Sequence, residues 1–481
     1  MMRLYARSHV PALTLALALA GGCWAGDEGD DLDPDGDFDD SGYDLGDGTG
    51  AGADDGDGPD DDIPNDEDLI DTVELGSDGD LDPAEVADLE EEAGVPDEED
   101  PWLEPDDPAA LRFAPAGTSL KAGCVARATL GGAQAWFFFV RPDAPCRGSG
   151  PGKDRNAMAE LIRLIRSVPK GGRIDGHIFN ISIDKVAKEL YEAQKRGVTV
   201  YISTDGQVGS SKDVAKTIYL DRLKHIVYCT GANRACIATA DRAISHTKLF
   251  TFSRATQPDG TTSNNVVWFG SANQTNFSGA DMFNDTVSIY GVEGLYKDLR
   301  HYLEDLYARK RTGDYYRPEK GRGRIMRHPA NVYVSPEDDT DLVNHRLDDL
   351  TPGPGCTVRV MQSMVKDNRL AIVDRLVAMK QGNCDVQMVV SMVEPQALAR
   401  LKGAGIPVRR ARVHNKNFII HGAFKGTTKY RVYTGSHNMG VGSRIFDEIF
   451  VKLAPEVGDS HPVFDAYMQH FADAFDGADP L

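Results

Sequence analysis

Apolar residues recur in the body of the chain in two alternating patterns, one typical of helices and the other of strands. Residues 156–167 place their apolar side chains at helical spacing, and residues 183–194 predict a second helix. Residues 172–181 and 198–202 have the composition of strands, the second of them buried. Strands that alternate with helices predict an α/β fold with largely parallel or mixed sheets.

The same order returns further along the chain. Residues 358–361 and 386–390 predict strands, while 370–379 and 396–402 predict helices. The segment 311–341, rich in Gly, Pro and charged residues, is interpreted as the connection between the two halves. We therefore expect a first lobe over 112–320 and a second over 321–481, each long enough for its own core.

The first 23 residues have the pattern of an export signal. Arg3 and Arg7 precede a short apolar run over 10–20, and small residues then lead to Cys23. This arrangement resembles a bacterial lipoprotein cleavage site with Cys23 lipidated, although Ala20 stands where leucine is usual. We expect an exported chain, anchored to a bacterial membrane through Cys23 or otherwise secreted.

Residues 24–111 are strongly acidic. They hold 37 Asp and Glu with no Lys or Arg, so the formal charge from Arg112 onward is +12 although the whole chain carries −23. A chain of this composition cannot bury enough apolar surface to offset its ordering entropy, which predicts a disordered tether. Residues 78–85 resemble the second half of a calcium-binding loop. A solvated charge run explains them better, because Glu74 and Gly76 stand where two aspartates are expected.

Six further cysteines fall into couples that are close in the sequence. In an exported chain an even number predicts disulfides, and neighbour pairing is favoured among 15 connectivities. Free buried thiols are the alternative. The sequence has no Cys-x-x-Cys motif, so a structural zinc site is not expected. The six are Cys124, Cys146, Cys229, Cys236, Cys356 and Cys384.

Each half also carries one copy of a polar motif. The first copy is His246-Thr247-Lys248, then Gly270-Ser271-Ala272-Asn273, then Phe283-Asn284-Asp285; the second is His414-Asn415-Lys416, then Gly435-Ser436-His437-Asn438, then Phe446-Asp447-Glu448. Residues i and i+2 of a strand share a face, so each histidine is expected beside its lysine. The Gly-Ser-x-Asn segments follow strands predicted at 266–269 and 431–434.

The paired His-x-Lys and Gly-Ser-x-Asn units resemble those of the phospholipase D superfamily, over most of residues 156–475. The resemblance implies two α/β lobes related by a pseudo-twofold axis, each a mixed sheet flanked by helices, with one active site at their interface. It also implies a phosphodiesterase that needs no metal or other cofactor.

Phosphodiester cleavage needs a nucleophile, a proton donor and positive charge around the phosphate. The resemblance makes His246 the nucleophile, through a phosphohistidine, and His414 the acid and base; pseudo-symmetry leaves the reverse open. Asp285 and Glu448, aligned through the preceding phenylalanines, are expected to accept hydrogen bonds from the histidines. The phosphate-binding residues are expected to be Lys248, Ser271, Asn273, Lys416, Ser436 and Asn438.

Two positions depart from the family pattern. An aspartate usually lies five residues after the lysine, whereas this chain has Ser253 and His421 there. That aspartate is regarded as supporting the motif, so its loss weakens the case for high activity. A degenerate member that only binds phosphate stays open, as does a metal site that uses His421 and His437.

The predicted reaction is hydrolysis of phospholipid head-group diesters to phosphatidic acid, with transfer to alcohols as a further outcome. A secreted endonuclease, a synthase of phosphatidyl head-group lipids and a noncatalytic module are the alternatives. The basic body fits anionic lipid and nucleic acid equally well. Residues 136–140 are expected to form a buried strand, and Tyr315, Tyr316 and the basic run 320–327 either contact an anionic surface or form a solvated loop.

Overall fold

The computed structural model describes residues 123–147, 153–210, 215–231, 233–317, 321–338, 341–456 and 460–481. The expected export signal, Cys23, the acidic segment and the calcium-loop-like residues 78–85 lie outside these ranges. Within them, no helix is long and apolar enough to span a membrane.

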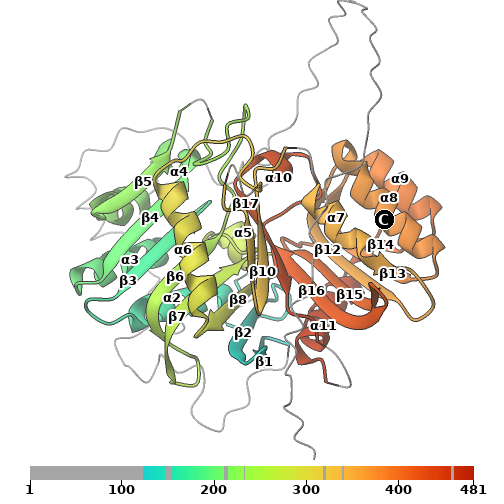
Figure 1. Cartoon of the computed structure of the whole chain (residues 1–481), viewed down its shortest axis with the longest axis horizontal. Coiled ribbons are helices and arrows are strands. Elements are labelled where there is room, and N and C mark those ends of the chain that lie inside the picture. Colours follow the sequence, from blue (N-terminus) through green and yellow to red (C-terminus); the bar gives the residue numbers. More distant parts are fainter. Residues whose placement is uncertain are drawn as a thin grey trace, which may run out of the picture. The chain divides into compact units, whose positions relative to one another are not determined.

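Two mixed sheets form the framework (Figure 1). In order across the first sheet the strands are β1 (Val125–Leu130), β2 (Ala133–Val140), β8 (Asn284–Tyr290), β7 (Thr262–Gly270), β6 (Leu249–Thr256), β3 (Arg173–Ile178), β4 (Thr199–Asp205) and β5 (His225–Cys229). The strands of the second sheet are β18 (Asp479–Pro480), β14 (Val408–Arg410), β13 (Asp385–Val393), β12 (Thr357–Val365), β15 (Lys416–Phe424), β16 (Thr427–Gly435), β17 (Glu448–Leu453), β10 (Ala330–Ser335) and β9 (Arg324–Arg327), with β11 (Leu350–Thr351) paired to β15.

The two sheets repeat one strand order. Reading from β5 in the first and β14 in the second, three parallel strands are followed by five antiparallel ones in the same sequence of connections. The parallel strands are joined by helices, as their geometry requires. This repeat confirms the expected pair of α/β lobes.

The helices cover both faces of the framework. They are α2 (Asn156–Ser167), α3 (Asp184–Lys195), α4 (Gly206–Ser210), α5 (Asn276–Ala280), α6 (Glu293–Tyr307), α7 (Leu342–Asp348), α8 (Leu370–Gln381), α9 (Pro395–Gly403), α10 (Gly442–Ile445) and α11 (Pro462–Asp476), with shorter turns at η2 (Ala215–Tyr219), η3 (Leu220–Arg222) and η4 (Asp367–Arg369). The helices predicted at 156–167, 183–194, 370–379 and 396–402 are α2, α3, α8 and α9. Their apolar stripes face the sheets, which is why the periodicity revealed them.

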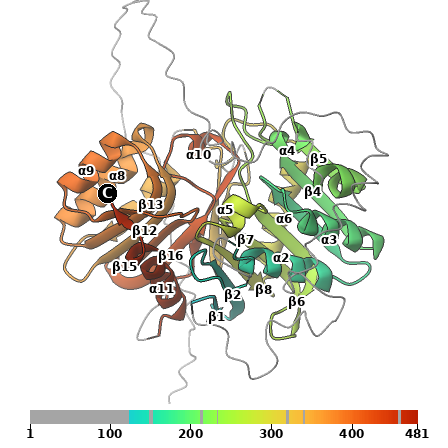
Figure 2. The ribbon, with the colours of Figure 1, turned by 180° about the vertical axis from the view of Figure 1, so that it is seen from behind.

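Three large apolar clusters stabilise the fold. One packs α2 and α3 on the first sheet, and a second packs α7, α8 and α9 on the other, with α8 and α9 at the outer side of the second lobe in both ribbon views (Figures 1 and 2). The third combines residues of both sheets with α6 and α11. The two lobes therefore share a hydrophobic core, and the interface between them is buried.

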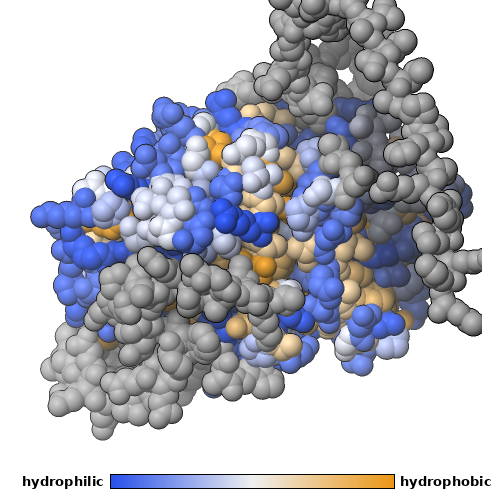
Figure 3. Space-filling model, turned by 90° about the horizontal axis from the view of Figure 1, so that it is seen from below, coloured by the Kyte–Doolittle hydropathy of each residue, from blue (hydrophilic) through white to orange (hydrophobic). Residues whose placement is uncertain are grey.

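Large apolar side chains are almost completely covered in the part of the chain that the structure describes. Phe277 and Met326 are its exposed large hydrophobic residues, at 37% and 38%. The face in Figure 3 shows hydrophilic residues around a more hydrophobic centre. The hydrophobic atoms visible there thus belong mostly to residues that are at most partly exposed.

The interpretation of 311–341 as a connection is wrong in part, because β9 and β10 lie within it and extend the second sheet. The two strands are short and β9 exposes three of its four residues, so the sequence there lacks a clear strand pattern. Tyr315 and Tyr316 are buried rather than part of a surface loop. The stretch 136–140 belongs to β2 and is buried, as predicted.

The cysteines are paired with their sequence neighbours. The disulfides are Cys124–Cys146, Cys229–Cys236 and Cys356–Cys384. Each bond stays within one lobe, so the contact between the lobes depends on noncovalent interactions.

Candidate active site

Each His-x-Lys segment is attached by its backbone to the opposite lobe. His246, which precedes β6, donates its amide to the carbonyl of Asp447, and His414, which precedes β15, donates to the carbonyl of Phe283. Isolated bridges join Ser245 to Asp447 and Phe283 to Val413. The two copies of the motif are thus brought to one place by pairing across the lobe interface.

The two histidines and the two lysines of the motifs interact electrostatically with one another. His246 and His414 are 3% and 1% exposed, so their surroundings are protein. Burial, then Lys248 and Lys416, lowers the pKa of His246 well below its ordinary value. Burial, then Lys416, Lys248 and His246, does the same to the pKa of His414. Both lysines therefore act on both rings, and both rings are neutral near pH 7.

The two lysines are held in the same way. The Nζ of Lys248 donates to the carbonyl of His246, and the Nζ of Lys416 donates to the carbonyl of His414, each at 2.7 Å. Both side chains are buried. Two ammonium groups fixed in a site of low dielectric attract an anion strongly.

The histidines have different partners at Nδ1. The Nδ1 of His246 lies 3.0 Å from Oε2 of Glu448, although the two atoms are not aligned as an ordinary hydrogen bond. The Nδ1 of His414 lies 3.1 Å from Oδ1 of Asn284. Asn284 donates its amide hydrogens to the carbonyls of Ser278 and Met282, which turns Oδ1 toward His414.

The expected contact of Asp285 with a histidine is therefore wrong by one residue. Gly270 pairs with Thr286 and Gly435 with Phe450, so Asn284, not Asp285, corresponds to Glu448. The alignment through the phenylalanines missed this shift because sheet pairing, not sequence, sets the register. The first copy thus has an amide where the second has an acid.

Asp285 instead forms hydrogen bonds with side chains of the second lobe. Its carboxylate is fully buried and accepts hydrogen bonds from two of the residues that flank Lys416, from β16, from α11 and from the serine of its own lobe's motif. The donors are Asn415, Asn417, Thr434, Tyr467 and Ser271.

The serines shape their turns. The hydroxyl of Ser271 accepts from the amide of Asp285 and has Oδ1 of Asn284 at 3.0 Å as an acceptor. The hydroxyl of Ser436 accepts from the amide of Ile449. The one hydroxyl proton of Ser271 has two side-chain acceptors, Oδ1 of Asn284 and Oδ1 of Asp285, so this serine helps to position both side chains. Ser436 lies in the matching turn, and phosphate binding by the two serines stays a prediction.

Both motif asparagines are buried. Asn273 donates from Nδ2 to Ser278, while its Oδ1 has no hydrogen-bond partner among the described residues. The backbone amide of Asn438 donates to the hydroxyl of Ser443, which is the corresponding serine. Each asparagine therefore donates to the serine five residues further on, through its side chain in the first turn and through its backbone in the second.

Three further residues, which the sequence does not single out, lie beside the motifs. The ring of Phe179 packs against His246 at 4.6 Å between centroids, and the Nζ of Lys248 lies 4.7 Å from its centre. Gln362 and Ser363, near Lys416 in the second sheet, have buried polar atoms with no partner in the described ranges. Phe179 follows directly after β3, and Gln362 and Ser363 lie within the last four residues of β12.

The positions that depart from the family pattern have structural roles. Ser253 accepts a hydrogen bond from the amide of Arg173 at 2.8 Å, so an acceptor remains there. His421 is stacked on Tyr430, and His437 lies near Ser335. Within the described ranges, no three His, Cys, Asp or Glu side chains are grouped as metal ligands would be.

No protein-family model matches this sequence, and no curated protein is detectably similar to it. Solved structures are similar in fold. Phosphatidylserine synthase of Haemophilus influenzae Rd KW20 has a TM-score of 0.45 and 10% identity, covering 67% of this chain and 84% of that one. Yeast tyrosyl-DNA phosphodiesterase has a TM-score of 0.40 and 11% identity, covering 67% and 90%.

Nuc from Salmonella typhimurium, described as a phospholipase D family member, has a TM-score of 0.25 and 20% identity over 32% of this chain and 97% of that one. Polyphosphate kinase from Porphyromonas gingivalis has a TM-score of 0.43 and 12% identity, and the chain spans about half of its length (67% of this chain, 48% of that one). Likenesses below a TM-score of 0.5 say nothing about the substrate of this chain.

Proposed function

We propose that the chain is a phosphodiesterase of the phospholipase D type, which hydrolyses phospholipid head-group diesters through a phosphohistidine. The observation that carries this proposal is the meeting of two His–Lys pairs from opposite lobes, with a carboxylate at one histidine and an amide at the other. Two neutral histidines between two ammonium groups suit a reaction on a phosphate anion. The lysines supply charge that a metal supplies elsewhere.

His246 is proposed as the nucleophile. A carboxylate beside Nδ1 favours the tautomer that keeps the proton there, so the lone pair of Nε2 is available for attack. In the first step Nε2 bonds to phosphorus, the P–O bond to the leaving alcohol breaks, and the positive charge on the ring is balanced by Glu448. The burial that lowers the pKa of His246 keeps the ring unprotonated before attack.

His414 is proposed to move the protons. Its Nδ1 faces a neutral amide oxygen, which stabilises an imidazolium less than a carboxylate does, so a proton on Nε2 is given up readily. His414 protonates the leaving oxygen in the first step. In the second it takes a proton from water as the water oxygen bonds to phosphorus and the P–N bond breaks. The negative charge of the bound phosphodiester offsets the lysines and favours protonation of His414.

Phospholipid is proposed as the substrate because the expected lipid anchor at Cys23 would hold a basic domain close to a membrane. The experiment incubates full-length protein with vesicles of phosphatidylcholine, phosphatidylethanolamine and phosphatidylglycerol in EDTA, and follows phosphatidic acid by mass spectrometry. We expect release that continues in EDTA and disappears in His246→Ala and in His414→Ala. His301→Ala, which removes a histidine outside both motifs, is the matched control.

The same variants separate the other outcomes. With a p-nitrophenyl phosphodiester, His414→Ala should accumulate a phosphoryl adduct on the peptide that contains His246; an adduct on His414 in His246→Ala would reverse the two roles. Cleavage of single-stranded DNA without lipid hydrolysis would make the protein a nuclease. Full activity in either alanine variant would contradict the shared site.

A further inference from the structure

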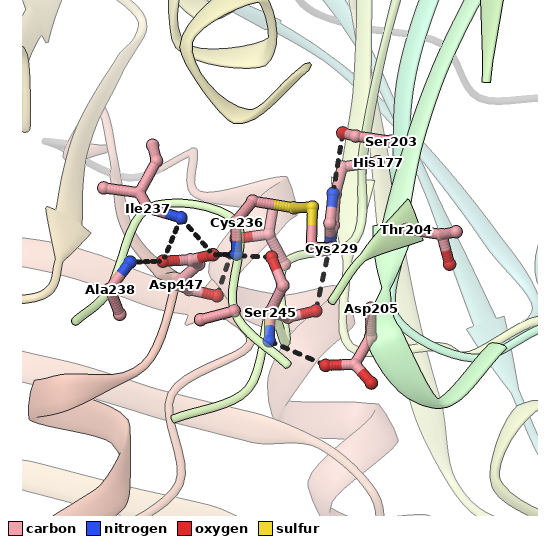
Figure 4. Close-up of a disulfide and its surroundings, with 12 residues drawn as sticks. His177, Ser203, Thr204, Asp205, Cys229, Cys236, Ile237, Ala238, Ser245 and Asp447 are labelled. Atoms are coloured by element: carbon pink, nitrogen blue, oxygen red, sulfur yellow. Dashed lines mark hydrogen bonds between the residues drawn. A yellow bond between two sulfur atoms is a disulfide. The ribbon is translucent and has the colours of Figure 1, made fainter. Parts of the chain in front are cut away.

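The Cys229–Cys236 disulfide holds a loop against the second lobe. Both cysteines are fully buried, and the bond joins the end of β5 to the start of the segment 236–238 (Figure 4). The backbone amides of that segment point to one carboxylate, that of Asp447. The donor distances are 2.7 Å from Cys236, 3.0 Å from Ile237 and 2.7 Å from Ala238.

Asp447 is matched to this loop by charge and by shape. It is fully buried, and the hydroxyl of Ser245 donates a fourth hydrogen bond to it at 2.7 Å. Successive backbone amides that face one point form an anion-binding concavity. Burial raises the pKa of Asp447, and the hydrogen bonds from Ser245 and the three amides act in the opposite direction. Ser245 is also fixed by Asp205, which accepts its amide hydrogen at 2.9 Å.

The backbone of Asp447 reaches the nucleophile. Its carbonyl accepts from the amide of His246 at 2.9 Å and from the hydroxyl of Thr247 at 3.0 Å, and its own amide donates to Ile244. The next residue is Glu448, whose carboxylate lies beside Nδ1 of His246. A displacement of Asp447 would therefore move both the histidine and its partner.

We propose that Asp447 is a positioning residue for His246, and that the loop closed by Cys229–Cys236 holds Asp447 in place. This inference rests on the proposed function, because it assigns His246 a role in turnover. The loop keeps three amides oriented before the lobes meet, so the side chain of Asp447 docks in one position. The disulfide thus contributes to catalysis through geometry and not only to stability.

The first lobe offers a matched control. Asp154 is also fully buried and also accepts four hydrogen bonds, all from backbone amides, including that of Cys146. Cys146 is bonded to Cys124. Asp154 therefore repeats the pairing of a buried acid with a disulfide loop, but its hydrogen bonds lead to no residue of the His-x-Lys motifs.

The experiment compares full-length wild type, Asp447→Asn and the double variant Cys229→Ser/Cys236→Ser with Asp154→Asn and Cys124→Ser/Cys146→Ser. We expect Asp447→Asn to lower kcat about 100-fold with little change in KM, since small misplacement of a reacting group costs this much. The double variant Cys229→Ser/Cys236→Ser should lower kcat about 10-fold. The control variants should lose stability while their kcat at a temperature below unfolding stays within about 3-fold of wild type.

A second readout does not depend on activity. Amide hydrogen exchange of residues 244–247 should accelerate in Asp447→Asn and in the 229/236 variant, and not in the controls. If folded Asp447→Asn keeps the kcat of the wild type, or if exchange at His246 is unchanged, the inference is overturned. If the wild type itself shows no turnover, the proposed function fails, and exchange alone decides whether the loop holds His246.

Discussion

At the scale of residues, the two halves of the site are chemically unequal. Glu448 faces His246, the proposed nucleophile, and Asn284 faces His414, the proposed acid and base. A carboxylate increases the basicity of its histidine, while an amide fixes the ring with little effect on its charge. The difference divides one symmetric arrangement into two roles.

Replacing Glu448 by Gln should lower kcat by about 100-fold, because the charge that balances the phosphohistidine is lost while the volume is kept. Stopped-flow kinetics with a p-nitrophenyl phosphodiester would measure the first step. Asn284→Ala, which removes the neutral partner of His414, should cost only about 10-fold. Equal losses in the two variants would contradict the assignment of roles.

Much of this level could be predicted from the sequence. The repeated motifs are enough to select both histidines and both lysines, which the structure brings together. They also select both asparagines, which the structure buries in the turns after β7 and β16. Asn284 was not selected because its place depends on the pairing of β7 with β8, which the sequence does not show. The sequence also predicts the serine hydroxyls as phosphate ligands. Their hydrogen-bond partners on β8 and β17 could not be read from it, because only folding brings those strands near.

At the scale of elements, the glycine of each Gly-Ser-x-Asn segment lets two strands approach closely. A Cβ on Gly270 would lie 2.3 Å from the carbonyl oxygen of Asp285, and one on Gly435 would lie 2.3 Å from that of Ile449. Gly435 also has a φ of +130°. The turn that holds each asparagine therefore needs a residue without a side chain.

Gly270→Ala should lower the free energy of unfolding by about 1–3 kcal/mol and reduce kcat, because β7 must move away from β8. Urea denaturation and the vesicle assay would measure the two effects. Gly403→Ala is the control, since a Cβ at that position of α9 meets no atom within 4 Å. A harmless Gly270→Ala would show that the turn tolerates displacement.

The helices and the central strands were predictable because their apolar periodicity is long and regular. The edge strand β9 was not, since its four residues include one buried side chain and leave little pattern. β10 pairs with β9 and β17 inside the sheet, and it was missed because it lies in a segment rich in Gly, Pro and charged residues. The sequence thus located the strands that carry the site better than those that complete the sheet.

At the scale of the molecule, the fold buries neutral histidines that would take up a proton below about pH 6.5 in the unfolded chain. Burial lowers the pKa of His470 to about 3, with Arg141 adding to the effect. Its ring packs against Phe139 and Phe283, in the cluster shared by both lobes. An unfolded histidine binds a proton below pH 6.5 while His470 in the folded state does not, so this residue lowers stability as pH falls through that value.

The drop in unfolding free energy from pH 7 to pH 5.5 should therefore be smaller in His470→Gln than in the wild type, by about 1 kcal/mol. Urea denaturation at the two pH values gives this difference, in which other groups cancel. Glu337, whose pKa burial raises to about 8, changes stability in the opposite direction and is common to both proteins. An equal drop in both would mean that His470 is protonated in the folded state.

The contact of Asp447 with the loop of the first lobe also has a consequence for the order of events on the ribosome. The carboxylate is separated from its backbone donors by 209–211 residues of chain. The first lobe can emerge with its own sheet complete and still lack both the acceptor for the amide of His246 and the carboxylate at its Nδ1. On the proposed function, activity therefore begins only after Asp447 and Glu448 have been synthesised, and we expect a translation product that ends before them to be inert.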